Sequence, residues 1–197
     1  MNKILEKEHF SEKVVKLVVE APMIAKARKP GHFVIVICEE HGERIPLTIA
    51  DADTERGTIT LVIQAIGLST QKICAKEPGE YLADVVGPLG QPTHISKFGT
   101  VVCCGGGVGV APLLPIIKAM KAAGNRVITV LAARTKDLII LEDQVRPWSD
   151  EVIIMTDDGS YGRQGLVTNG VEDVIQREQV DMVVTIGPAI MMKFVSL

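Results

Sequence analysis

Hydrophobic and polar residues alternate in short runs over the first half of the chain, a pattern typical of β-strands. A single helical pattern, at residues 69–76, interrupts these runs and stops at Pro78-Gly79. Strands this short, separated by turns, predict a small antiparallel β-barrel over residues 1–97. The predicted strands are residues 12–20, 31–38, 43–50, 57–65 and 80–88.

From residue 98 onward, buried-strand runs alternate with helical patterns. Pro112 suits the first turn of the first helix, and Gly124 suits its C-terminal cap. This alternation predicts a parallel, doubly wound α/β domain over residues 98–197. The last helical pattern stops at Leu197 without a cap, which indicates a C-terminally truncated chain. The predicted strands are 100–104, 126–133, 151–156 and 180–187, and the helices are 111–124, 136–145, 170–178 and 188–197.

The composition is that of an ordinary globular protein. The 197 residues are 47% hydrophobic and 23% charged, enough to bury a core in each of two small domains. A net charge of -3 gives no reason to expect nucleic acid or an anionic membrane as a partner. No apolar run is long enough to span a membrane, and the N-terminus lacks the features of a signal peptide. The expected location is the cytoplasm.

The four cysteines do not form a metal-binding motif. Cys38, Cys74, Cys103 and Cys104 include no C-x-x-C pair, and no histidine stands at metal-ligand spacing from them. Cys103 and Cys104 are neighbours on a predicted strand, so their side chains point to opposite faces. We therefore expect buried thiols and no metal site.

The stretch "VVCCGGGVGVAP", residues 101–112, carries the strongest chemical signal. Four glycines stand between a predicted strand and a predicted helix, more than one tight turn requires. In a parallel sheet this loop lies where ligands bind, and glycines let the backbone approach a pyrophosphate at the helix N-terminus. The usual dinucleotide fingerprint is incomplete, because Val110 holds its third glycine position. A P-loop motif is absent.

These features together resemble the ferredoxin-NADP reductase superfamily, whose first domain holds a flavin and whose second binds a nicotinamide nucleotide. The resemblance rests on a barrel followed by "GGGVGVAP" and a late "GPAIMM". Within the superfamily, "PGHFV", "RIPLTIAD", "QAIGLST" and "IGPAIMMKFVS" are most similar to two kinds of electron-transfer subunit. One belongs to dihydroorotate dehydrogenase B. The other is the small subunit of sulfide dehydrogenase, or NADH-dependent reduced ferredoxin:NADP oxidoreductase.

The resemblance implies FAD contacts in the first domain. Thr48 matches the residue whose hydroxyl sits near flavin N5, the catalytic position. Arg44 stands one residue before the family's arginine position, so either a flavin phosphate contact or a solvated charge fits it. "GLST" matches the pyrophosphate element, although a plain helix N-terminus explains it equally well when taken alone. The expected flavin-binding residues are Arg44, Pro46, Leu47, Thr48, Gln64, Gly67, Ser69 and Thr70.

In the second domain the resemblance implies contacts with NAD(P)H. The glycine loop matches the family's pyrophosphate-binding loop. Arg134 and Thr135 match the site that contacts the adenosine ribose, and Gly187-Pro188 matches the loop beside the nicotinamide. Asp157 and Asp158 either line the same site or form an acidic turn. Met191 and Met192 are interpreted as helix packing. The expected nucleotide-binding residues are Gly105, Gly106, Gly107, Gly109, Pro112, Arg134, Thr135, Asp157, Asp158, Gly187 and Pro188.

The implied activity is hydride transfer between NAD(P)H and FAD. In the full-length protein, electrons then pass through a [2Fe-2S] cluster, expected beyond Leu197, to a larger flavin- or iron-sulfur-containing subunit or to ferredoxin. A stand-alone flavin or ferredoxin reductase and a non-catalytic nucleotide-binding subunit are the alternatives. The choice between NAD and NADP stays open, because Arg134 and Lys136 suit a 2′-phosphate whereas the nearest relatives often use NADH.

Overall fold

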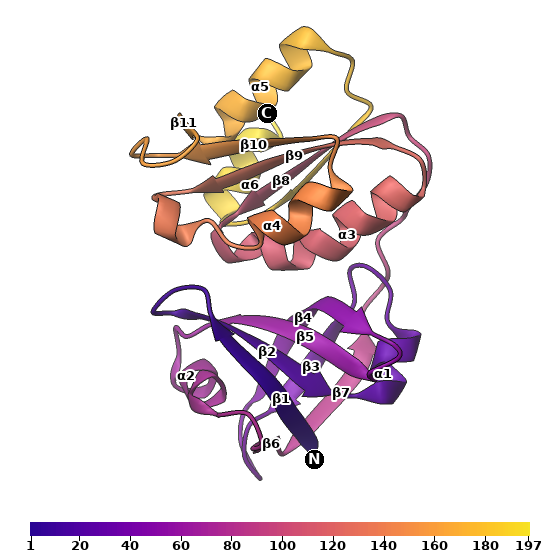
Figure 1. Cartoon of the computed structure of the whole chain (residues 1–197), viewed down its shortest axis with the longest axis vertical. Helices are drawn as coiled ribbons and strands as arrows, with labels where there is room; N and C mark the ends of the chain where they lie inside the picture. Colours follow the sequence, from indigo (N-terminus) through magenta and orange to yellow (C-terminus); the bar gives the residue numbers. More distant parts are fainter. The chain divides into compact units, whose positions relative to one another are not determined.

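The computed structural model describes residues 1–197, which form two compact units, Met1–Thr93 and His94–Leu197 (Figure 1). Hydrogen bonds on either side of the boundary at Thr93-His94 attach the connecting segment to one unit or the other. The Thr93 N–H donates to the Pro30 carbonyl at 2.9 Å, within the first unit. The Asn125 side-chain oxygen accepts from the N–H groups of Phe98, at 2.7 Å, and Gly99, at 3.1 Å, within the second.

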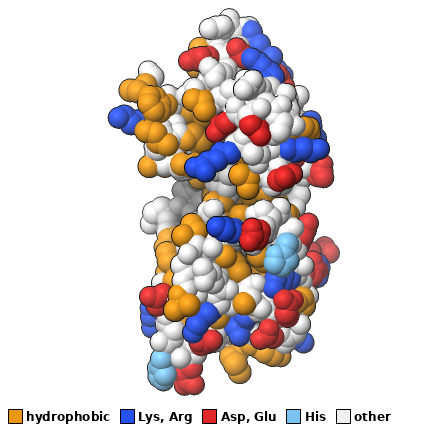
Figure 2. Space-filling view, turned by 90° about the vertical axis from the view of Figure 1, so that its left-hand side faces the viewer, with side chains coloured by type: hydrophobic (Ala, Val, Ile, Leu, Met, Phe, Trp, Pro, Cys, Tyr) orange, Lys and Arg blue, Asp and Glu red, His pale blue; other side chains and the backbone are white.

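The surface carries charges of both signs. On the face drawn in Figure 2, acidic and basic side chains are interspersed with hydrophobic ones, and neither sign forms a continuous field. A steering surface for a polyanion would need such a field. None of the helices combines the length and the apolar character that crossing a bilayer demands.

The first unit is an antiparallel β-sheet that curls into the predicted barrel. Two of its elements, β1 and α1, were not predicted. Ile4 is the only buried residue of β1 amid charged neighbours, and α1 has only 6 residues. Its elements are β1 (Asn2–His9), β2 (Val14–Glu20), α1 (Pro22–Ala27), β3 (Phe33–Ile37), β4 (Arg44–Asp53), β5 (Thr58–Gln64), α2 (Leu68–Ala75), β6 (Tyr81–Leu82) and β7 (Asp84–Leu89).

Chain connectivity nearly closes this barrel. The strand order is β6-β1-β2-β5-β4-β3-β7, so β6 and β7 occupy opposite edges of the sheet. Only Ala83 separates them in sequence, which forces the two edges together. The sequence predicted one strand over residues 80–88. The structure divides it, because the first part pairs with β1 and the second with β3.

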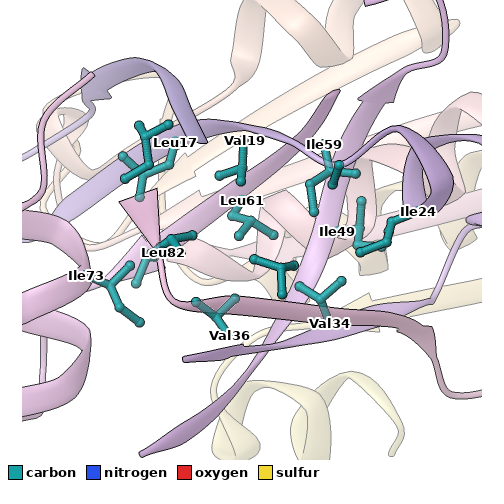
Figure 3. Close-up of a cluster of buried hydrophobic side chains, with 14 of the residues drawn as sticks. Leu17, Val19, Ile24, Val34, Val36, Ile49, Ile59, Leu61, Ile73 and Leu82 are labelled. Atoms are coloured by element: carbon teal, nitrogen blue, oxygen red, sulfur yellow. The ribbon is translucent and has the colours of Figure 1, made fainter. Parts of the chain in front are cut away.

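The barrel core consists of aliphatic side chains that alternate along the strands. Leu17 and Val19 of β2 face Ile59 and Leu61 of β5, all with no exposed surface (Figure 3). Ile73 of α2 covers one end of this cluster. Burying an aliphatic side chain stabilises the fold by roughly 1.5–3 kcal/mol, so this cluster dominates the stability of the unit.

The second unit is the predicted α/β domain, a parallel sheet with helices α3 and α4 on one face and α5 and α6 on the other (Figure 1). The fold class predicted from sequence is therefore confirmed. Its elements are β8 (Thr100–Gly106), α3 (Val110–Ala122), β9 (Arg126–Ala133), α4 (Glu142–Val145), β10 (Glu151–Thr156), β11 (Arg163–Gln164), α5 (Val167–Arg177), β12 (Met182–Ile186) and α6 (Ala189–Val195), with 3₁₀ turns at Gly107–Gly109, Lys136–Leu138 and Arg146–Trp148.

The strand order of this sheet is β11-β10-β9-β8-β12. The chain runs outward from β8 through β9 to β10 and then returns to place β12 on the other side of β8. The order therefore reverses between β8 and β12, which makes this the topological switch point. In open α/β sheets, ligands bind outside the carboxyl ends of the strands at such a point.

The helix predicted over residues 136–145 is wrong. A 3₁₀ turn covers Lys136–Leu138, and α4 begins only at Glu142. Between them Leu141 has a left-handed backbone, with φ 60°, and Ile140 and Leu141 are buried. Burying both apolar side chains of this linking segment takes precedence over the local helical pattern.

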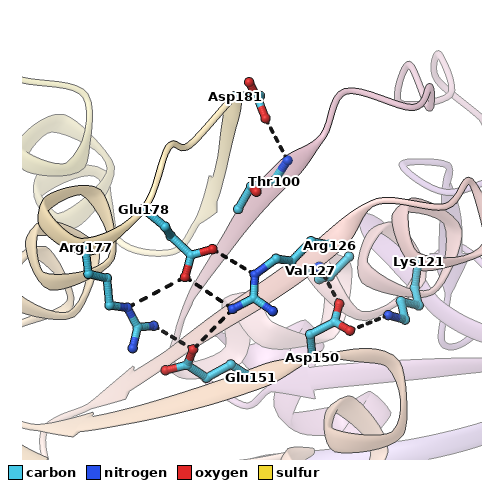
Figure 4. Close-up of polar contacts among 9 residues, drawn as sticks. All are labelled: Thr100, Lys121, Arg126, Val127, Asp150, Glu151, Arg177, Glu178 and Asp181. Atoms are coloured by element: carbon cyan, nitrogen blue, oxygen red, sulfur yellow. Dashed lines mark hydrogen bonds and ion pairs between the residues drawn. The ribbon is translucent and has the colours of Figure 1, made fainter.

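At the amino ends of the strands a group of charged residues ties sheet and helices together (Figure 4). The Arg126 guanidinium contacts Glu178 at 2.7 Å, and Arg177 contacts Glu151 at 2.6 Å. Asp150 accepts a hydrogen bond from Lys121 at 2.7 Å. This amino-edge cluster lies at the opposite end of the strands from the glycine loop.

Candidate functional site

Strand β4 has an open backbone edge in its first half. Residues 44–48 pair with β3, whereas pairing with β5 begins only at Ile49. The Ile49 N–H donates to the His32 carbonyl at 3.1 Å, on the β3 side. Because backbone groups alternate along a strand, those of Pro46 and Thr48 point toward the open edge. Proline fits at position 46 because no partner strand needs its missing N–H.

The side chains of this segment alternate as well. Ile45 and Leu47 pack against the barrel core, and the backbone groups of Leu47 point toward β3, so the predicted flavin contact of Leu47 is not at the open edge. Thr48 therefore points to the outer side of the strand. Arg44, the first residue of β4, is exposed.

Helix α2 begins beside this edge. Gly67 is its N-cap, and Ser69 and Thr70 lie in its first turn, directly after Gln64 ends β5. The Thr70 hydroxyl accepts from the N–H of Gly67 at 3.1 Å. The first-turn N–H groups have no partner within the helix, and the helix dipole makes this end electropositive.

A hydrogen bond joins the two predicted flavin elements. The Ser69 hydroxyl donates to the carboxylate of Glu43, the residue before β4. Lys72, one turn further along α2, forms an ion pair with Glu39 at 2.8 Å. The structure thus brings "RIPLT" and "GLST", which are far apart in sequence, to one edge of the barrel.

In the second unit the glycine loop leaves the switch point. Gly105 and Gly106 end β8, Gly107 and Gly109 form the 3₁₀ turn, and Pro112 lies in the first turn of α3. The other predicted nucleotide-binding residues leave the carboxyl ends of neighbouring strands. Arg134 and Thr135 follow β9, Asp157 and Asp158 follow β10, and Gly187 and Pro188 follow β12. The parallel sheet therefore gathers the whole predicted set at one edge.

The four glycines serve different purposes. A Cβ built on Gly106 would collide with the Met191 sulfur, and one on Gly109 with the Ile186 carbonyl. A Cβ on Gly105 would lie 2.8 Å from Val110 Cγ2. At these three positions the lack of a side chain makes room for neighbouring residues of the same domain and not for a ligand.

Gly107 alone faces open space. It has φ +54°, and a Cβ there would have no neighbour within 4 Å. A left-handed backbone favours glycine, and the free space in front of it lies at the N-terminus of α3. Gly107 is therefore the position in the loop that a ligand can approach closely, and this cradle fits a pyrophosphate.

Hydrogen bonds hold together the loops after β9 and β10. The Asp158 N–H donates to the Arg134 carbonyl at 3.3 Å, and the Lys136 N–H to the Ser160 hydroxyl at 2.9 Å. Hydrogen bonds from Ser160 hold the pKa of Asp158 below its ordinary value. The Lys136 ammonium stands 5.5 Å from the centre of the Tyr161 ring. The Asp158 carboxylate, bonded to Ser160, thus lies in the same pair of loops as Arg134.

The cysteines are all free and buried, as predicted. Burial raises the pKa of the Cys103 thiol to about 12, and that of Cys104 is also raised. These thiols stay protonated and unreactive at neutral pH. No three His, Cys, Asp or Glu side chains gather in the geometry of a metal site.

Three residues at the site were missed by sequence reasoning. Glu43 and Ser160 are ordinary loop residues, and no local signal distinguishes them. Met191 was interpreted as helix packing, and it does pack against the buried cluster of the domain, but sequence reasoning missed that its side chain also lies against Gly106 and Gly187. Its position three residues after Pro188, about one helical turn into α6, is the signal that it returns toward the sheet edge.

Comparisons with known proteins agree with this architecture. Residues 103–197 match the family model described as oxidoreductase NAD-binding domain. The chain is 43% identical over 197 residues to the dihydroorotate dehydrogenase B (NAD(+)) electron transfer subunit homolog of Thermotoga maritima, a match that covers 100% of this chain and 70% of that protein. It is 30% identical to the dihydroorotate dehydrogenase B (NAD(+)) electron transfer subunit of Bacillus cereus strain Q1, with 96% and 74% covered.

A solved structure gives the same result. The NADH-dependent reduced ferredoxin-NADP oxidoreductase, described in the context of flavin-based electron bifurcation, superposes with a TM-score of 0.94 at 40% identity. The match covers 98% of this chain and 70% of that one. Because it shares this two-unit fold, the NAD-binding domain and this level of identity, the chain belongs to the electron-transfer subunit family of dihydroorotate dehydrogenase B and NADH-dependent ferredoxin-NADP oxidoreductase, within the ferredoxin-NADP reductase superfamily.

Proposed function

We propose that this chain is a flavoprotein electron-transfer subunit that moves a hydride between NADH and FAD and passes the electrons to a partner catalytic subunit. The observation that carries the proposal is the open edge of β4 beside the start of α2. It offers unpaired backbone groups for a flat polar ring system and helix N–H groups for a diphosphate, as FAD requires.

In this proposal the backbone of Pro46 and Thr48 binds the flavin ring system, and the Thr48 hydroxyl contributes a hydrogen bond near the reacting atom. Gly67, Ser69 and Thr70 bind the diphosphate, with Arg44 and Gln64 at the margins. Bound FAD supplies the two-electron acceptor that no side chain of the protein can provide. The protein's own contribution is binding, orientation and exclusion of water.

The nucleotide is assigned to the second unit. Gly107 and the first turn of α3 receive its pyrophosphate, Arg134 and Thr135 its adenosine ribose, and Gly187-Pro188 its nicotinamide end. Two observations favour NADH over NADPH. The names of the two dihydroorotate dehydrogenase B relatives specify NAD(+). In addition, the Asp158 carboxylate in this pair of loops opposes a 2′-phosphate near the ribose, whereas Arg134 and Lys136 would attract one.

Electron delivery to a partner follows from the kinship with proteins named as subunits. The [2Fe-2S] cluster implied by the resemblance needs ligands other than Cys38, Cys74, Cys103 and Cys104, because these are buried in two separate cores. A larger flavin- or iron-sulfur-containing subunit, and ferredoxin, remain the proposed acceptors.

The test is reconstitution of the purified chain with FAD, followed by gel filtration and anaerobic titration with NADH and with NADPH. We expect flavin absorbance to coelute with the protein and to bleach at lower NADH than NADPH concentration. Replacing Thr48 by Ala should slow bleaching about tenfold, the effect of one hydrogen bond. Thr54→Ala, in the exposed turn after β4, is the matched control. NADH binding without bleaching would favour a non-catalytic nucleotide-binding subunit instead.

A further inference from the structure

Met191 lies against both loops of the switch point. A Cβ added to Gly187 would stand 2.6 Å from the Met191 methyl carbon and 3.0 Å from its sulfur. A Cβ added to Gly106 would collide with the same sulfur and lie 3.2 Å from Pro188 Cδ. The thioether therefore fills the space that side chains at both glycines would need.

The same side chain is anchored in the core of the domain. Met191 and Val195 of α6 pack against the buried cluster that includes Cys104 of β8 and Val171 of α5. The two loops that Met191 touches leave adjacent strands, since Gly105 pairs with Ile186. A displacement at Met191 is therefore transmitted to both loops together.

We propose that Met191 is a positioning residue that sets the distance between the Gly105–Gly107 loop and the Gly187–Pro188 loop, and so the seat of the nicotinamide nucleotide. The nucleotide part of this inference rests on the proposed function. A long, flexible and polarizable thioether suits the role, because it reaches between two glycine backbones where a β-branched side chain would not.

A double-mutant cycle tests the packing itself. Gly106→Ala should lower the melting temperature of the full chain, because its Cβ takes the place of the sulfur. Met191→Ala removes that sulfur, so the double variant should regain most of the loss caused by Gly106→Ala. If Gly106→Ala fails to fold, rescue appears as recovery of soluble protein in the double variant. Strictly additive losses, or no rescue, would overturn the proposal.

Binding of NAD+, measured by calorimetry on the same chain, tests the positioning role without any turnover. We expect Met191→Ala to weaken NAD+ binding about tenfold, equivalent to about 1.4 kcal/mol, and Met191→Leu to restore most of the affinity. Met192→Ala is the matched control on the same helix, since 36% of that residue is exposed. Equal affinity of the Met191→Ala and Met192→Ala variants, or no NAD+ binding by the wild type, would overturn the inference.

A different result would refute the proposed function without refuting the role of Met191. A wild-type chain that binds NAD+ but whose bound FAD is not bleached by NADH would contradict hydride transfer. The melting cycle and the NAD+ affinities would still decide the role of Met191.

Discussion

At the scale of single residues, glycines of the same loop are required for different physical reasons. The Met191 sulfur leaves no room for a side chain at Gly106, and the Ile186 carbonyl leaves none at Gly109. Gly107 is constrained only by its left-handed backbone and faces open space. A substitution at Gly107 therefore separates ligand approach from packing, which a substitution at its neighbours cannot do.

We predict that Gly107→Ala weakens NAD+ binding about tenfold, because its methyl group lies where the pyrophosphate meets the backbone. The backbone strain should cost about 1–2 kcal/mol of stability. Gly124→Ala is the matched control. Gly124 follows the other end of α3, has φ +82°, and a Cβ there would meet only Lys97 Cδ at 4.0 Å. Both variants should lose similar stability in denaturant titrations. An equal loss of NAD+ affinity in both would contradict this role of Gly107.

At the scale of elements, Asp150 fixes the start of β10 to its surroundings. Its carboxylate accepts from Lys121 of α3 at 2.7 Å and from the Val127 N–H of β9 at 2.8 Å. The hydrogen bond from Lys121 is the main cause that lowers the pKa of Asp150 below its ordinary value. Figure 4 shows these contacts beside the Arg126 and Arg177 ion pairs. Three elements thus meet at one side chain.

A lowered pKa means that the ionised form is favoured by folding. Its stabilising effect is present above the unfolded pKa, about 3.9, and is lost as the pH falls through the lower folded value. We predict that Asp150→Asn reduces the free energy of unfolding by about 0.5–1 kcal/mol at pH 7, a modest value because the pair is partly exposed. The difference from wild type should shrink below about pH 4.

Urea titrations at pH 7 and at low pH measure this difference. Asp143→Asn, at an exposed position of α4, is the matched control and should be nearly neutral at both pH values. A loss in Asp150→Asn that persists unchanged in acid would show that charge is not its cause.

At the scale of the whole molecule, each unit has its own buried core. The barrel core and the cluster between the parallel sheet and α5 share no residue. Barrel closure depends on β7, because β6 and β7 are the two sheet edges that the chain joins at Ala83. The first unit should therefore fold by itself only when β7 is present.

We predict that a fragment of residues 1–93 unfolds cooperatively in urea and shows a strand-rich circular dichroism spectrum. A fragment of residues 1–83, which lacks β7 and leaves β3 paired with β4 alone, should remain unfolded or aggregate through the exposed edge of β3. Cooperative folding of the shorter fragment would show that closure by β7 does not stabilise the barrel.

The sequence by itself determined the parts of this protein that local chemistry encodes. Alternation located strands such as β2 and β5, and Pro112 and Gly124 marked the ends of α3, because these signals depend on periods and turns within a few residues. The glycine loop and the "RIPLT" and "GLST" motifs predicted the family, which the comparisons confirmed. The roles of individual site residues stay predictions, since they depend on ligands.

Only the tertiary structure decided which distant residues meet. It closed the barrel through β6 and β7, left the first half of β4 unpaired on its β5 side, and broke the predicted 136–145 helix to bury Ile140 and Leu141. It also showed that Met191, more than 80 positions away in sequence, is what approaches Gly106. The physical reason is that strand neighbours and packing partners are selected by register and shape across the whole fold, which no local period records.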